Sequence, residues 1–91
     1  MEWAVATYLV DRDLAGISMD GLAAAQQAAI STSANFREAG TDVTYLHSVF
    51  EPASGHCMCF FEAGDADTVA RVNDEAQLPY QRVAEVLDLN P

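Results

Sequence analysis

The segment from His56 to Ala63 constrains the fold more than any other part of this chain. It is a short, nearly continuous apolar run between Gly55 and Gly64. Short apolar runs between glycines are typical of strands that are buried on both faces. Because side chains alternate along a strand, one face of this segment would present Cys57, Cys59 and Phe61. A small chain must therefore cover both sides of a sheet.

Length and charge limit the classes of protein that the chain can belong to. Its 91 residues, half of them hydrophobic, predict a single globular domain over residues 1–91. Four arginines, with no lysine, face fourteen carboxylates and give a net charge of −10. This sign argues against nucleic acid or an anionic membrane as a partner. With no apolar stretch near the ~20 residues of a membrane span and no signal-like N-terminus, we expect a cytoplasmic protein.

Apolar periodicity predicts six elements. The expected strands are Trp3–Val10, Thr41–Glu51, His56–Ala63 and Gln81–Leu87, and the expected helices are Met19–Ala39 and Ala66–Gln77. Ser18 and Asp65 are the expected N-caps, and Gly40 has the position of a left-handed C-cap. The residues from Asp11 to Ser18 are expected to form a loop. The apolar stripe of the first helix has unusually small side chains, which either brings the helix close to a sheet or leaves room beside it.

The order of these elements predicts the fold class. It is βαββαβ, an α+β ferredoxin-like arrangement with a four-stranded antiparallel sheet and two helices on one face. In that arrangement the first and third strands are central. These are the two strands that are apolar on both faces, whereas the second and fourth are more polar.

Two helices cover only one face of such a sheet, so the other face would stay open. Monomers seldom expose a contiguous apolar patch beyond ~300–600 Å². The simplest cover is a second copy packed sheet to sheet about a two-fold axis. We therefore expect a homodimer resembling an α/β barrel, in which the facing sheets can enclose a ligand cavity.

The two cysteines and two histidines are the candidate metal ligands. Cys57 and Cys59 are spaced too awkwardly along one strand for a disulfide, which predicts free thiols. If the hairpin loop is symmetric about Ala53, His47 lies opposite Cys59. One imidazole and two thiols would then suit a transition metal; the alternative is that both cysteines are small core residues. His56 is expected to be exposed, or to form a near-surface metal site with Glu51.

Three further residues are candidates for a ligand pocket. In the symmetric hairpin Tyr45 lies opposite Phe61 and offers a hydroxyl. Glu62 lies in an apolar strand, where it would need an arginine partner or would act as a general base with a raised pKa. Asn73 lies on the buried stripe of the second helix and either ties that helix to a strand end or binds a ligand.

Several segments together resemble a known family. They are Thr7–Arg12, Val43–Ser48, Cys57–Ala63, Val72–Pro79 and Arg82–Val86. The chain resembles the small bacterial nickel-binding proteins of ferredoxin-like fold, a domain family otherwise uncharacterised. The resemblance implies a homodimer and, in some members, nickel binding. It implies no catalytic reaction and assigns no metal ligands to positions in this chain.

These observations favour a non-enzymatic homodimeric binding protein for a transition metal, with nickel first and zinc or copper as alternatives, and no catalytic residues. The second hypothesis is a small cofactor-light enzyme of oxygenase or isomerase type. It would take a hydrophobic small molecule into an intersubunit cavity, with His47, Tyr45 or Glu62 as acid or base. A plain interaction module without a ligand is the third.

Overall fold

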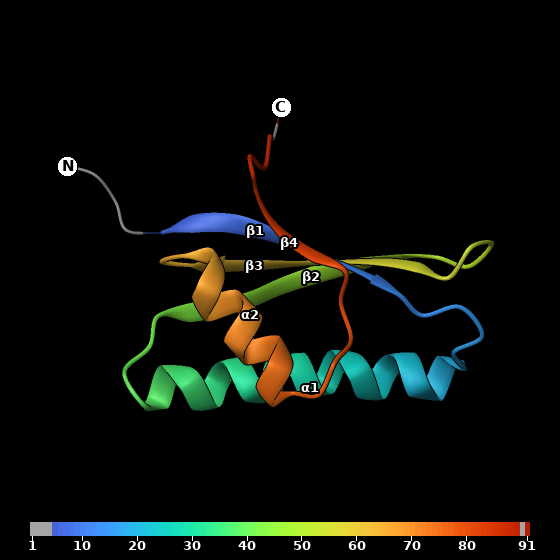
Figure 1. Cartoon of the computed structure of the whole chain (residues 1–91), viewed down its shortest axis with the longest axis horizontal. Coiled ribbons are helices and arrows are strands. Elements are labelled where there is room, and N and C mark those ends of the chain that lie inside the picture. Colours follow the sequence, from blue (N-terminus) through green and yellow to red (C-terminus); the bar gives the residue numbers. More distant parts are fainter. Residues whose placement is uncertain (1–4, 90) are drawn as a thin grey trace.

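The structure of the chain is a computed structural model that describes residues 5–89 and 91. Its elements are β1 (Ala6–Asp13), α1 (Met19–Glu38), β2 (Val43–Glu51), β3 (His56–Ala63), α2 (Ala66–Glu75) and β4 (Arg82–Val86). The strands form one antiparallel sheet in the order β2-β3-β1-β4. Both helices lie on the same side of that sheet (Figure 1). The predicted ferredoxin-like fold, with the first and third strands at the centre, is confirmed.

The core lies between the two central strands and the helices. The odd-numbered side chains of β3 point to the helices, where Phe61 is fully buried. Neighbouring positions on β1 add Tyr8 and Val10, and α2 adds Val69 and Val72. The even-numbered side chains of β3 therefore lie on the opposite side of the sheet, which no helix covers. We call this second side the open face.

Both helices begin at the predicted caps. The Ser18 hydroxyl accepts a hydrogen bond from the Gly21 N–H at 3.0 Å, and the Asp65 carboxylate accepts one from the Thr68 N–H at 2.8 Å. Along α1 only Ala29 and Ser33 are fully buried. Neither helix in the described part of the chain combines the length and the hydropathy of a membrane span.

The second helix is shorter than predicted. It ends at Glu75 rather than at Gln77 because Gln77 has a left-handed backbone conformation, with φ at 59°. The Leu78 N–H then donates to the carbonyl of Asn73 at 3.0 Å. This closure satisfies a carbonyl at the helix end, as left-handed C-caps do.

The first strand extends beyond its predicted end. Val10 was expected to be the last strand residue and Asp11 the first of a loop, but pairing continues through Asp13, which lies opposite His56. The charged residues here remain in the strand because they have polar partners. Asp11 contacts His56 and Arg82 on the neighbouring strands, whereas Arg12 donates to Asn73 of α2 and to the carbonyl of Pro79. The predicted start at Trp3 lies outside the described residues.

The β2–β3 hairpin follows the predicted register only in the half that lies away from the turn. Tyr45 pairs with Phe61 there as expected, but a bulge at Leu46 shifts the half next to the turn by one residue. His47 consequently pairs with Phe60, and Ser48 pairs with Cys59. The prediction that His47 lies opposite Cys59 is therefore wrong, because one extra residue in β2 carries the imidazole to the open face.

Candidate functional site

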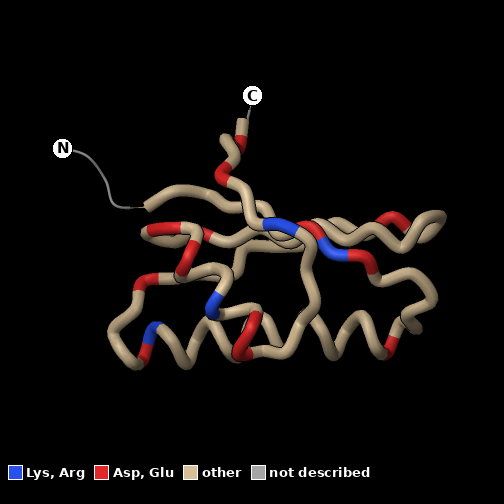
Figure 2. The backbone as a smooth tube through the Cα atoms, in the orientation of Figure 1, with Lys and Arg blue, Asp and Glu red and all other residues tan. Residues whose placement is uncertain are grey.

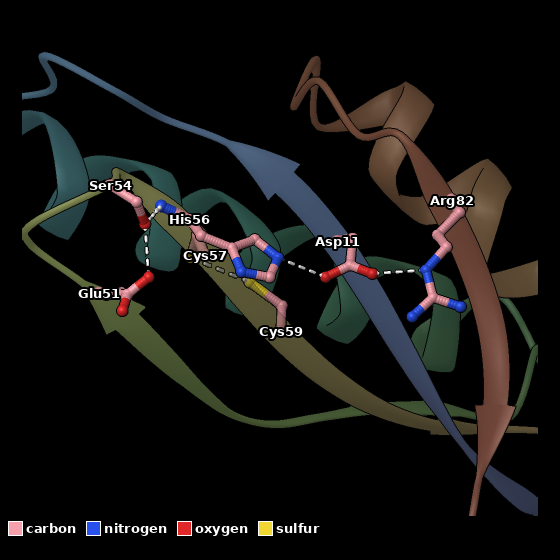
Figure 3. Close-up of polar contacts among 7 residues, drawn as sticks. All are labelled: Asp11, Glu51, Ser54, His56, Cys57, Cys59 and Arg82. Carbon is pink, nitrogen blue, oxygen red and sulfur yellow. Dashed lines mark hydrogen bonds and ion pairs between the residues drawn. The ribbon is translucent and has the colours of Figure 1, made fainter.

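A row of three polar side chains crosses the open face at one end of the sheet (Figure 3). Asp11 lies at its centre on β1. His56 of β3 contacts one carboxylate oxygen, with 2.7 Å from Nε2 to Oδ1, and Arg82 of β4 contacts the other, with 2.5 Å from Nε to Oδ2. Asp11 is only 8% exposed, whereas the side chains of His56 and Arg82 are about half exposed. The carboxylate is thus held between one imidazole and one guanidinium.

The surroundings of Asp11 keep its carboxylate charged. Burial alone would raise its pKa, but the hydrogen bonds from His56 and Arg82 outweigh burial and hold the pKa of Asp11 below its usual value. A carboxylate has no proton to donate, so Nε2 of His56 is the donor in their contact. In the neutral imidazole the other ring nitrogen, Nδ1, then carries no proton and offers a lone pair.

The loop next to His56 orders the backbone beside this row. The Ser54 hydroxyl donates to the Glu51 carboxylate at 2.6 Å and accepts from the His56 N–H at 3.1 Å (Figure 3). Glu51 pairs with His56 in the strand ladder. Its carboxylate is engaged by Ser54, so the structure shows no direct contact between Glu51 and the His56 ring.

The two thiols lie on the other side of the sheet, beneath α1. Cys57 and Cys59 are both buried and free, with their Sγ atoms 3.8 Å apart. A chain of hydrogen bonds leads to Cys59 from the surface. Its members are Gln26, Tyr45 and Ser48, with 3.0 Å from Gln26 Nε2 to the Tyr45 hydroxyl, 2.6 Å from that hydroxyl to Ser48 Oγ and 2.9 Å from Ser48 Oγ to Cys59 Sγ. The prediction of free thiols is confirmed.

Cys57 is a protonated thiol at neutral pH. Burial and the neighbouring Cys59 raise the pKa of Cys57 to about 11, although nearby Arg12 acts in the opposite direction. Since thiolates rather than thiols are metal ligands, a metal ion would first have to displace this proton. The environment of Cys57 is that of a core residue.

The structure does not bring the predicted metal ligands together. The ring of His47 stacks on Phe60 on the open face, with ring centroids 4.8 Å apart, while Cys57 and Cys59 lie on the helix side. His56 is also on the open face but contacts Asp11. Within the described part of the chain, no three His, Cys, Asp or Glu residues gather as a metal site would require.

The predicted pocket residues are also separated. Tyr45 packs edge-on against Phe61 on the helix side. Glu62 is exposed on the open face, and no ion pair of the described residues includes it, so the expected arginine partner is not found. Asn73 is fully buried, and its carbonyl oxygen accepts a hydrogen bond from Arg12 at 2.8 Å. Asn73 thus ties α2 to the end of β1, as one reading of the sequence predicted.

The sequence analysis missed the roles of Asp11 and Arg12, since it placed both residues in a loop. A signal was present in the strand pattern: Tyr8, Val10 and Arg12 have the same parity, as have Leu9 and Asp11. Continuing that alternation past Val10 would have placed the arginine under the helices and the aspartate on the open face.

The fold and this arrangement define a small α+β domain of ferredoxin-like topology with one helix-covered and one open sheet face. Residues 8–86 match the family described as "Nickel responsive protein SCO4226-like", and the chain belongs to that family. The crystal structure of SCO4226 from Streptomyces coelicolor A3(2) is similar, with a TM-score of 0.78 at 27% identity over 92% of this chain and 100% of that chain. A comparison with curated proteins gave no match.

Proposed function

We propose that this protein is a non-enzymatic homodimer that binds a transition metal ion, nickel before zinc or copper, at the open face of its sheet. The single observation that carries the proposal is the contact between His56 and Asp11 at 2.7 Å. The description of the family as "nickel responsive" supports the choice of metal.

The contact resembles the support that metal-binding histidines generally have. Such a histidine donates its second ring N–H to a carboxylate, which fixes the tautomer and makes the other nitrogen more basic. Here Asp11 accepts from Nε2 of His56 and leaves Nδ1 for a metal, and imidazole is a ligand that suits nickel, copper and zinc. Asp13 lies opposite His56 in the ladder and, with Ser54 and Gln81, lines a shallow surface pocket beside the ring.

Within the described residues, one copy of the chain offers too few ligands for a closed site. The described residues contain no cluster of three ionisable ligands, so the remaining positions would be filled by a second copy or by water. This need links metal binding to dimerisation. In this site Asp11 positions the imidazole ring of His56, and His56 is the metal ligand.

The apolar surface of the open face supports the dimer. Its side chains include Val49, which is 48% exposed, Leu46, which is 36% exposed, and the half-buried Leu9, Met58 and Phe60. Exposed apolar groups that adjoin one another are typical of protein interfaces. A two-fold axis through this face would bury both copies of the patch and would pair the open sides of the two sheets.

Calorimetry with nickel, zinc and copper salts on untagged protein tests the metal site. We expect saturable nickel binding that weakens at least about tenfold in His56→Ala, whereas His47→Ala and the double variant C57S/C59S keep the affinity of the unmodified protein. Sedimentation of the same samples reports the dimer. Absence of saturable binding below about 100 μM would remove the proposal, because surface carboxylates alone bind cations that weakly.

A further inference from the structure

A cavity of about 240 Å³ lies on the helix side of the sheet, between the first half of α1 and the outer parts of β2 and β3. Its walls are mostly apolar and include Leu22, Ala25, Phe50, Cys57 and Cys59. The cavity exists because α1 presents small side chains here, so the helix does not fill the space above the strands. The sequence left two alternatives, a helix packed close to the sheet or a helix with room beside it, and the structure has the second.

A buried arginine also lines this cavity. Arg12 is 1% exposed, and its guanidinium donates two hydrogen bonds, from Nη1 to the carbonyl of Pro79 at 3.1 Å and from Nη2 to Oδ1 of Asn73 at 2.8 Å. Both acceptors are neutral. A further N–H faces the sulfur of Cys57. The guanidinium has five N–H groups, so these contacts still leave donors over.

The charge of Arg12 lacks a full counter-charge among the described residues, whose ion pairs do not include it. Buried charges are ordinarily paired, because an isolated one loses its hydration. The C-terminal end of α2 near Asn73 contributes a partial negative charge. The neighbouring thiol of Cys57 contributes none at neutral pH, since burial raises its pKa to about 11.

We infer that the cavity binds a small organic monocarboxylate, with its apolar body between α1 and the sheet and its carboxylate on Arg12. Arginine is the side chain whose planar donor fork matches a carboxylate. At about 30 Å³ for each water-sized volume, the cavity of about 240 Å³ suits an apolar body of roughly eight non-hydrogen atoms. This site is separate from the proposed metal site, because it lies on the opposite side of the sheet.

The charge distribution permits an anion here despite the net charge of −10. The helix that forms one wall has no charged residue between Asp20 and Arg37, and this stretch of α1 is tan in Figure 2. The carboxylates elsewhere on the surface act through solvent, where charges are screened over about 8 Å at physiological salt. The buried guanidinium is therefore the dominant local charge for a ligand inside the cavity.

Calorimetry and amide NMR with three probes of one chain length test the inference on the unmodified, metal-free protein. We expect octanoate to bind one per chain with a Kd below about 1 mM, and at least about tenfold more tightly than 1-octanol or octylamine. The amide signals of Ala25, Cys57 and Cys59 should shift as octanoate is added. Equal affinity for octylamine, or no saturable octanoate binding in this range, would overturn the inference.

Two helix variants separate filling of the cavity from general damage. Ala25→Leu places a larger side chain in the cavity, and we expect it to weaken octanoate binding at least about tenfold while the protein stays folded. Ala24→Leu, on the exposed side of the same helix, should leave the affinity unchanged. Unchanged affinity in Ala25→Leu would contradict the assigned position. Nickel binding is expected to be the same in both variants, so failure of either site is recognised independently of the other.

Discussion

Gly55, in the loop between β2 and β3, lies with its backbone directly against that of Ala15 in the loop after β1. A Cβ atom added to Gly55 would lie 2.3 Å from the Cα of Ala15 and 2.5 Å from its nitrogen. Next to this contact, the Leu14 N–H donates to the carbonyl of Gly55 at 2.8 Å. The contact joins two loops at the end of the sheet where both candidate sites lie.

Replacing Gly55 by alanine should therefore destabilise the protein severely. Gly55 has φ at +81°, so alanine would incur the left-handed backbone cost of about 1–2 kcal/mol and would also overlap with backbone that cannot move aside. We expect Gly55→Ala to lose more than about 3 kcal/mol of unfolding free energy, or not to fold.

Gly16 is the matched control for this change. It has nearly the same φ, +83°, but no atom lies within 4 Å of an added Cβ. Gly16→Ala should therefore lose only the backbone cost of about 1–2 kcal/mol. Urea denaturation of both variants gives the comparison, and equal losses would show that the contact with Ala15 contributes nothing.

Replacing Asp11 by asparagine removes the charge that His56 and Arg82 share. We expect the free energy of unfolding at pH 7 to fall by about 1–2 kcal/mol. Hydrogen bonds to charged groups contribute in this range, and the contribution is reduced here because the two partners of Asp11 are half exposed to solvent. Glu62→Gln, on the exposed part of the same face, should change it by less than about 0.5 kcal/mol. If the two variants lose equal stability in chemical denaturation, the row on the open face has no stabilising role.

The contribution of Asp11 should also depend on pH in one direction. Its pKa is lowered in the folded protein from an ordinary value of 3.8, so its stabilisation is complete above that value and is lost as the pH falls through the lower, folded pKa. The stability difference between the unmodified protein and Asp11→Asn should thus shrink as the pH falls below 3.8. A difference that stays constant down to pH 2.5 in urea titrations would contradict the lowered pKa.

The thiol of Cys57 should be nearly unreactive in the folded protein. With the pKa of Cys57 raised from 9.0 to about 11, its thiolate fraction at pH 8 falls about 100-fold, and burial blocks access in addition. A disulfide reagent added at pH 8 should therefore label Cys57 at least about 100-fold more slowly in buffer than in urea. Cys59→Ser isolates the signal of Cys57, and rapid labelling of that variant in its folded state would contradict the assignment of Cys57 to the core.

Much of the fold could be predicted because local patterns and topology agree. The strand from His56 to Ala63 is apolar on both faces and is central in the sheet, as its pattern indicates. Ser18 and Asp65 cap their helices because the hydrogen bonds that caps make are local in sequence. Such features depend on residues a few positions apart and can be recognised in a single chain.

The candidate sites could not be predicted in the same way, because they depend on pairing between distant strands. Arg82 reaches Asp11 across 71 positions of sequence, and Arg12 reaches Asn73 across 61. The bulge at Leu46 likewise depends on how β2 meets β3, and nothing in the local sequence marks it. A single unmarked residue therefore moved His47 from the predicted thiol site to the opposite side of the sheet.

The same bulge affects how copies of the chain can associate. β2 is an outer strand of nine residues, and regular outer strands act as templates on which further strands of other copies assemble into fibrils. A bulge twists such a strand and interrupts its row of free backbone groups. The strand at the other edge, β4, has only five residues. The extra residue at Leu46 thus opposes open-ended assembly along this edge, and in the proposed dimer the open face of the sheet, rather than its edge, would join the two copies.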